Sequence, residues 1–390
     1  MTQNDAPDSP SPDAHADASP GATPDGSPDD TLETTRETSA ALPTSVAALH
    51  SRKPSVIALL RTFGPTVALI LLVVVTVATQ YARQGSVTFL NPDNLLNILR
   101  QQSFIGIVAL GMTFVIILGG IDLSVGSLAA FAGGMAILTV NAVLEGGQSE
   151  GVAIGAAAVI CLLVGIAAGL FNGAVIVFGK VAPFVATLGG LAAYRSLAKA
   201  PVEAAEYRTA GTEHFDVIGN GGLPIPFLRN HYDEALQLPW PVIIFLLMAI
   251  AAWVLLRATR FGRYVVAIGC NERAAVYAAV PVKRVKLLTY TLVGLCCGVA
   301  AFLLASRMNS VASSSMGMLY ELDAIAAVVI GGTAMRGGAG TIFGTVIGVI
   351  MLGVINNMLT MLGINVHYHG LVKGVIIIAA VLVQRFEERT

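Results

Sequence analysis

Five polar side chains stand within or between long apolar stretches, and they are the residues best placed to contact a solute. They are Asp122, Asn172, Thr187, Asn356 and Asn357. Amide and hydroxyl groups at such positions either hydrogen-bond neighbouring helices together or line a polar path, and sequence spacing favours neither. Neutral donors and acceptors suit an uncharged, polyhydroxylated solute better than an ion. We therefore take these five residues as candidates for a translocation path, and their neutral groups favour a sugar as the transported solute.

The carboxylate of Asp122 needs a separate explanation because it is charged. It lies in the string GGIDLSVGS at the junction of two apolar runs. A lipid-facing carboxylate at the bilayer centre costs roughly 2.5–3.5 kcal/mol, so the side chain must face protein, lie near an interface or cap a helix. Asp122 or Ser124 can satisfy the free amides that open the next helix. Glu321 and Asp323 could form a proton relay, but at a span entrance we expect them to be solvated.

A second group of residues suits contact with a protein partner. Asn271 can cap a short helix from Glu272 to Val280 that carries small side chains and ends at Pro281. A short helix with small side chains, held between basic flanks, could insert into a groove of another protein. An ordinary helix at the membrane interface is the alternative.

Nothing in the chain suggests catalysis. The phosphate-binding motif GxxxxGK[ST] is absent, since Val181 follows Lys180 and Ala174 occupies the position of the first glycine. The four cysteines show no CxxC or Cys/His spacing typical of metal sites. We therefore expect no cofactor, no metal and no ATPase activity in this chain.

The composition points to a membrane protein. Hydrophobic residues make up 55% of the 390 positions and charged residues only 12%, whereas soluble domains carry about 25% charged residues. Basic residues lie between long apolar runs rather than along a solvated face, which argues against nucleic-acid binding.

The intervals between charged residues indicate the membrane crossings, because a helix needs about 20 apolar residues to cross. Six intervals of sufficient length are well supported. They run from Arg61 to Arg83, Arg100 to Asp122, Asp122 to Glu145, Glu150 to Lys180, Glu234 to Arg257, and Lys286 to Arg307.

Four weaker candidates bring the total to ten. They lie at 183–199, at 322–335, within 336–373 and at 371–383. The sequence thus predicts an all-α polytopic membrane protein with about ten transmembrane helices, and eight is the alternative count.

Charge asymmetry predicts the orientation. Segment 257–286 carries seven basic residues against one acidic residue, which is typical of a cytoplasmic loop. Loop 200–238 carries six acidic and two basic residues, so we expect it on the periplasmic side. Basic residues before the first crossing and after the last place both termini in the cytoplasm.

The chain divides into a tail and a membrane domain. Residues 1–50 hold nine acidic residues, one basic residue and seven prolines. With so few apolar side chains this stretch cannot repay the entropy of ordering, so we predict a disordered, acidic cytoplasmic tail. Residues 51–390 form the transmembrane domain.

Glycine pairs recur in two similar strings. VIILGGIDLSVG at 115–126 resembles VVIGGTAMRGG at 328–338. Small residues let helix backbones approach closely, and paired glycines permit broken helices where the freed backbone faces protein. We expect a tightly packed bundle and, as a weaker hypothesis, an internal repeat.

At this point the sequence resembles a known family, the membrane permeases of bacterial ATP-binding cassette (ABC) sugar importers of the ribose, xylose and arabinose type. The resemblance covers about residues 90 to 384. The strings that carry it are GGIDLSVGS, GLFNG with PFVATLG after it, GCNERAA, and YELDAIAAVVIGGTAMRGGAGTIFGTVIG followed by NN and VKG.

The resemblance implies a ten-helix fold similar to the cobalamin-importer permeases. It also implies two permease copies, two cytoplasmic ATPase copies that bind ATP and Mg, and a periplasmic sugar-binding protein. By the same resemblance, the predicted short helix after Asn271 is the coupling helix that contacts the ATPase. Its usual small-Gly-Ile ending is replaced in this chain by Ala279-Val280. The residues of that helix that would contact the ATPase are Asn271, Glu272, Arg273, Ala274 and Ala275.

The sequence therefore predicts a permease subunit of an ATP-driven monosaccharide importer in the bacterial inner membrane. An ion-coupled secondary transporter is the alternative, although paired carboxylates deep in the spans are lacking. If coupling runs through the cytoplasmic loop, Glu272→Pro should abolish uptake and leave the protein in the membrane.

Overall fold

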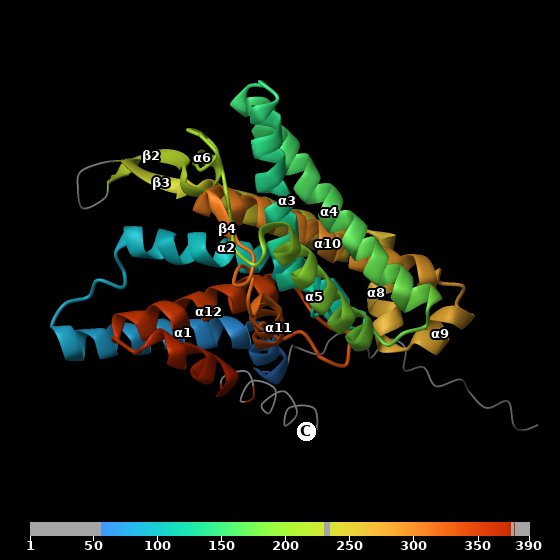
Figure 1. Cartoon of the computed structure of the whole chain (residues 1–390). Helices are drawn as coiled ribbons and strands as arrows, with labels where there is room; N and C mark the ends of the chain where they lie inside the picture. Colours follow the sequence, from blue (N-terminus) through green and yellow to red (C-terminus); the bar gives the residue numbers. More distant parts are fainter. Residues whose placement is uncertain (1–55, 230–234, 376–377, 379–390) are drawn as a thin grey trace, which may run out of the picture. The chain divides into compact units, whose positions relative to one another are not determined.

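The computed structural model describes residues 56–229, 235–375 and 378, and most of them are helical (Figure 1). The predicted tail at 1–50 and most of the predicted crossing at 371–383 lie outside the described residues. The helices are α1 (Val56–Gln84), α2 (Pro92–Ile117), α3 (Val125–Glu145), α4 (Glu150–Phe178), α5 (Pro183–Lys199), α6 (Val217–Asn220), α7 (Trp240–Ala258), α8 (Arg260–Cys270), α9 (Glu272–Tyr277), α10 (Val282–Met308), α11 (Tyr320–Ile330) and α12 (Ile342–Met361).

Seven of the described helices are long and apolar enough to cross a membrane: α1 from Pro65, α2, α3, α4, α7, α10 and α12. They correspond to the six well-supported intervals and to the crossing expected within 336–373. Helix α5 has 17 residues and α11 has 11, which is about 16 Å of helix. The polytopic prediction is confirmed, whereas the count of ten stays a prediction.

The short helix α11 is preceded by irregular chain that enters the bundle. Strand β4 (Ser310–Ala312) pairs antiparallel with β1 (Glu206–Arg208), beside the C-terminal part of α3, where Asn141 donates to the Arg208 carbonyl at 2.9 Å. Further along, Gly317 meets the first turn of α3, since a Cβ on Gly126 would overlap the Gly317 carbonyl oxygen. The segment thus runs beside α3, with Val311, Ser313 and Gly317 buried against protein. Irregular backbone at membrane depth is tolerated where it is covered by protein.

Glycines bring α4 and α10 into backbone contact. A Cβ added at Gly165 would overlap the Gly294 carbonyl oxygen, and one at Gly294 would overlap the Gly165 carbonyl oxygen. One turn away, Gly298 faces the Cys161 carbonyl at a similar separation. The predicted close packing is confirmed here, and it includes Gly294 and Gly298, whose part in it the sequence did not indicate.

The acidic loop 200–238 contains regular secondary structure. After a 3₁₀ turn at Ala200–Val202, it contains β1, α6 and a hairpin of β2 (Gly222–Arg229) with β3 (Ala235–Pro239). The Gly219 amide in α6 donates to Ser306 Oγ near the end of α10 at 2.9 Å.

Glu150 also anchors this loop. Its carboxylate accepts from the His214 amide at 2.7 Å and lies 3.0 Å from His214 Nδ1. That hydrogen bond raises the pKa of His214 above its ordinary 6.5.

The variant Glu150→Gln tests whether the Glu150 carboxylate raises the pKa of His214. The carboxylate contact favours charged His214, so its anchoring contribution is complete below the ordinary pKa and is lost as pH rises through the raised one. In Glu150→Gln, NMR titration of ring-labelled histidine should show the pKa of His214 falling towards 6.5. An unchanged value would contradict the pairing, and His214→Gln identifies the signal.

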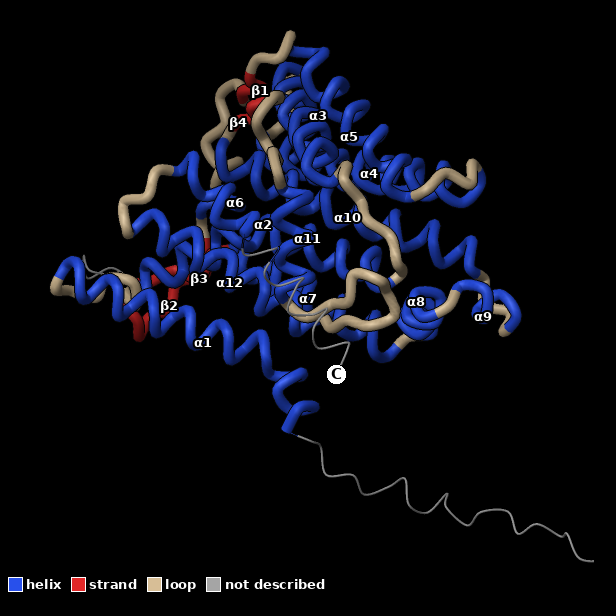
Figure 2. Tube along the Cα trace, turned by 90° about the horizontal axis from the view of Figure 1, so that it is seen from below, coloured by secondary structure: helices blue, strands red, loops and turns tan. Residues whose placement is uncertain are grey.

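Different elements lie at the two ends of α10. Figures 1 and 2 place α8 and α9 at one end of α10, and α6 with the β2–β3 hairpin at the other. This agrees with α9 preceding the start of α10 and with α6 packing at its end. The two loops that the charge pattern assigned to opposite membrane faces therefore lie at opposite ends of one spanning helix.

Candidate functional site

Three of the five candidate path residues come together where α2 breaks into α3. Asp122 Oδ1 accepts from the Ser124 amide at 2.8 Å and from Ser124 Oγ at 2.7 Å. Asn172 of α4 donates to Ser124 Oγ at 2.9 Å, and its Oδ1 accepts from the Tyr194 hydroxyl of α5 at 2.9 Å. Thr187 of α5 donates to the Ile121 carbonyl at 3.3 Å.

This cluster is closed to solvent in the described conformation, because Asp122, Ser124, Asn172 and Thr187 are all at most 2% exposed. Asp122 accepts a hydrogen bond from the amide of Ser124, the residue immediately before α3, as expected of a capping group. The Ser124 side chain itself makes no capping hydrogen bond. The cluster fastens the α2–α3 break to α4 and α5. The sequence reasoning missed Tyr194, although a tyrosine in an apolar stretch calls for a partner for its hydroxyl.

Asn172→Ala should destabilise the protein by about 1–3 kcal/mol, because it leaves the Ser124 and Tyr194 hydroxyls buried with one partner fewer. Thermal unfolding of the purified protein measures this. Tyr194→Phe is the partner variant, and the double variant should lose less than the sum of the single losses. Strictly additive losses would contradict the network.

The other two candidates lie elsewhere. Asn357, in α12, exchanges amide hydrogen bonds with Asn94 in the first turn of α2, at 2.8 and 3.2 Å. The cluster around Asp122 follows the other end of α2, so the five residues do not form one site. Asn356 Oδ1 is buried and accepts no hydrogen bond within the described part of the chain.

Asp323 is largely buried in an ion pair, so the expectation that it is solvated was wrong. Its two carboxylate oxygens accept from Lys373 Nζ at 2.9 and 3.0 Å, and both side chains are largely buried. The pair ties α11 to the helical residues after 369. A carboxylate held by a fixed lysine is poorly suited to a proton relay.

The predicted partner-binding helix is present and shorter than expected. Asn271 Oδ1 accepts from the Ala274 amide at 3.0 Å, so the predicted cap of α9 is confirmed. The helix ends at Tyr277 rather than Val280, because Ala279 adopts a left-handed φ of 56°. Pro281 does not end it but precedes the first residue of α10. Ala279 and Val280, where this chain departs from the family pattern, thus lie in the turn after α9. The left-handed backbone conformation of Ala279 is one that favours glycine.

Glu272 occupies the first position of α9, where proline is tolerated. Its carboxylate pairs with Lys286 of α10 at 2.7 Å. Glu272→Pro would therefore remove this ion pair without disrupting α9. This variant is a poor test of whether α9 couples the ATPase to transport. Ala275→Pro is the better one, because the Ala275 amide donates to the Asn271 carbonyl at 3.0 Å and its side chain is buried.

Helix α9 exposes two large apolar side chains. Tyr277 is 91% exposed and Val276 is 56% exposed. Four of the five predicted contact residues, Asn271 to Ala274, are also exposed, whereas Ala275 packs inward. The sequence reasoning missed Val276 and Tyr277 because it weighed the small residues and overlooked the large ones beside them.

The two glycine-pair strings end helices in the same way. After α2, the Gly119 amide donates to the Ile116 carbonyl and the Gly120 amide to the Val115 carbonyl, both at 2.9 Å. After α11, the Gly332 and Thr333 amides repeat the pattern at 2.9 and 3.2 Å. Both are Schellman caps, with φ of 87° at Gly119 and 88° at Gly332. Gly119 and Gly332 are therefore structurally equivalent. Aligning the two glycine pairs in the sequence would instead match Gly119 with Gly331, so the structural equivalence is shifted by one residue.

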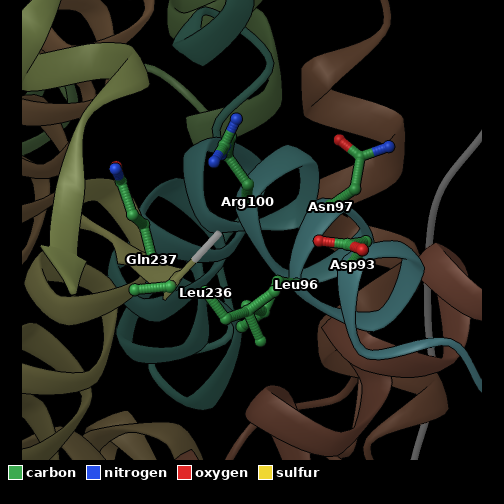
Figure 3. A pocket seen from close by; sticks show the side chains of 7 residues that line it. Asp93, Leu96, Asn97, Arg100, Leu236 and Gln237 are labelled. Carbon is green, nitrogen blue, oxygen red and sulfur yellow. The ribbon is translucent and has the colours of Figure 1, made fainter. Parts of the chain in front are cut away.

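A pocket of about 290 Å³ lies at the N-terminal end of α2 (Figure 3). Arg100 and Gln237 offer hydrogen-bond donors, and Asp93 and Asn97 offer acceptors. Arg100 Nε is buried and has no partner among the described residues. None of the five candidate path residues lines this pocket. Its lining is Asp93, Leu96, Asn97, Arg100, Ala235, Leu236 and Gln237.

Comparison with known proteins identifies relatives over most of the chain. Residues 94–381 match the family model described as branched-chain amino acid transport system / permease component. The chain is 39% identical over 327 residues to the ribose import permease protein RbsC of Bacillus subtilis (strain 168), which covers 83% of this chain and 92% of that protein.

Two further relatives are similar. The ribose import permease protein RbsC of Escherichia coli (strain K12) is 40% identical over 302 residues, 76% of this chain and 87% of that protein. The autoinducer 2 import system permease protein LsrD of Escherichia coli (strain SMS-3-5 / SECEC) is 37% identical over 278 residues, 71% of this chain and 79% of that protein. No solved structure matches the chain at a significant level.

Proposed function

Because the chain belongs to the family of branched-chain amino acid transport system permease components, we propose that it is the membrane-spanning subunit of an ATP-driven importer for a monosaccharide or related polyol. The observation that carries the substrate class is the similarity, at about 40% identity, to permeases whose names specify ribose import. The chain is a transport component, and its family's energy source lies in a separate subunit.

The proposal assigns four kinds of partner. A cytoplasmic ATPase that binds ATP and Mg receives α9, a sugar-binding protein delivers the solute on the periplasmic side, a second copy of this chain completes the path, and membrane lipid surrounds the assembly. The exposed Val276 and Tyr277 of α9 support the ATPase contact, since an uncovered aromatic side chain on a basic segment is typical of a surface that binds a protein.

The orientation follows from the same assignment. With α9 in the cytoplasm of a bacterial inner membrane, the β2–β3 hairpin and the pocket beside Arg100 lie at the periplasmic end, where a solute arrives. Both termini are cytoplasmic if the chain crosses ten times in a fold similar to the cobalamin-importer permeases. The irregular segment 309–319 together with α11 serves as one of those crossings.

Passage of the solute requires the closed cluster to open. The five candidates, Asp122, Asn172, Thr187, Asn356 and Asn357, remain our proposed path residues. In the closed state Asp122 and Asn172 both hydrogen-bond to Ser124, and Thr187 donates to backbone carbonyls. Asn356 Oδ1 lacks a partner among the described residues, and a sugar hydroxyl could supply one. The buried Tyr290 hydroxyl beside Gly120 is a second such atom within the described residues.

The experiment is reconstitution with the native ATPase and binding protein. Thermal-shift screening of the binding protein against pentoses, hexoses and polyols identifies the solute, and uptake into proteoliposomes is then measured with ATP on the α9 side. We expect uptake to require ATP and the binding protein together. No stabilisation by any sugar would contradict the substrate class, and ATP-independent uptake driven by a proton gradient would favour the ion-coupled alternative.

A further inference from the structure

A backbone hydrogen bond joins two broken regions of the bundle. The Gly338 amide, in the loop between α11 and α12, donates to the Ile117 carbonyl at 2.8 Å. Ile117 is the last residue of α2, so this carbonyl has no partner within its own helix. The bond therefore joins the end of α2 to the start of the chain that leads into α12.

The C-terminal end of α8 packs directly on that bond. A Cβ on Gly269 would overlap the Ile117 carbonyl oxygen and would lie 2.6 Å from the Gly338 amide nitrogen. The next residue, Cys270, lies 3.6 Å through its sulfur from the Gly338 carbonyl oxygen. A Cβ on Gly338 would in turn lie 3.1 Å from the Cys270 Cα. At Gly269 the contact is backbone against backbone, whereas the Cys270 sulfur also contacts Gly338.

Gly269 is also close in sequence to α9. Cys270 ends α8, and Asn271 caps α9. A displacement of α9 therefore reaches the Ile117–Gly338 bond through two residues. Packed backbone transmits displacement because it lacks the rotamer freedom by which side chains absorb it. On the other side of the bond, α2 leads into the Asp122 cluster and the α11–α12 loop leads into α12.

We propose that Gly269 is a positioning residue that couples movement of α9 to the two breaks, at Ile117 and Gly338, and that the three segments move as one body. This inference rests on the proposed function. It goes beyond that function by naming the contact through which a push on α9 reaches the α2–α3 break.

The first test compares Gly269→Ala with Gly189→Ala in the reconstituted complex. Gly189, in α5, has nothing within 4 Å of an added Cβ, so its variant controls for the gain in helix propensity. In Gly269→Ala we expect sugar transported per ATP hydrolysed to fall about tenfold, a coupling loss of ordinary size. ATPase co-purification and basal ATP hydrolysis should stay unchanged. Normal sugar per ATP in Gly269→Ala would overturn the proposal.

A second measurement uses the wild-type protein, in case Gly269→Ala fails to accumulate. Among the four cysteines Cys270 is exposed and the other three are buried, so maleimide labels it selectively. If the three segments move together, its labelling rate in the ATPase-bound complex is the same with and without trapped nucleotide. A rate that rises with nucleotide would show that Cys270 separates from Gly338, and would contradict the proposal.

The two failures are distinguishable. If the wild-type complex shows no ATP-dependent sugar uptake, the proposed function is wrong. If the wild type transports and Gly269→Ala remains fully coupled, the function stands and only the junction is wrong.

Discussion

Tyr277→Ala lowers ATP-dependent uptake severely and leaves the permease folded. The side chain is 91% exposed, so its removal costs no internal packing. Burying an aromatic anchor in a partner's groove is worth about 2 kcal/mol or more, which is roughly thirtyfold in affinity. We therefore expect the ATPase to co-purify poorly with the variant, while thermal unfolding of the permease alone is unchanged.

Tyr368→Ala is the matched control. Tyr368 is 60% exposed in the 3₁₀ turn Val366–Tyr368, which is not part of α9. Its variant should retain ATPase binding and uptake. If Tyr277→Ala also binds the ATPase with full affinity, the surface formed by Val276 and Tyr277 is not the docking surface, and lipid contact becomes the better explanation for its exposure.

Gly165→Leu is expected to prevent stable folding. At this crossing of α4 and α10 the atoms that a new side chain meets belong to the Gly294 and Gly298 backbone, which cannot rotate away. We expect a loss above about 3 kcal/mol, the upper end of ordinary overpacking. The yield of monodisperse protein after detergent extraction and its melting temperature measure the effect.

Gly155→Leu, on the same helix, separates this effect from a general intolerance of substitution. An added Cβ at Gly155 has nothing within 4 Å, so this variant should fold as the wild type does. Equal losses at both positions would mean that α4 tolerates no larger side chain anywhere, and that the contact with α10 is not the cause.

Much of the architecture could be inferred from local pattern. The lengths of apolar runs identified the long helices, because the bilayer imposes the same length on any spanning helix. The charge asymmetry correctly separated loop 200–238 from segment 257–286. The cap of α9 by Asn271 was also predictable, since an N-cap depends only on a side chain and an amide three residues away.

The polar site could be predicted only in part. Asp122, Asn172, Thr187, Asn356 and Asn357 were recognisable as unusual, but not as two separate groups. Asn172 meets Ser124 across 48 residues, and Asn94 meets Asn357 across 263. Such pairings depend on which helices pack together and at what depth, and no periodicity along the chain encodes them.

Composition and hydropathy were enough to establish a polytopic helical bundle with glycine-lined contacts, because burial in lipid and backbone hydrogen bonding constrain every segment separately. The burial of Asp323 beside Lys373 and the meeting of Ile117, Gly269 and Gly338 emerged only from the folded arrangement. In each case the deciding energy is a contact between segments far apart in the chain, so its strength depends on a geometry that no single segment contains.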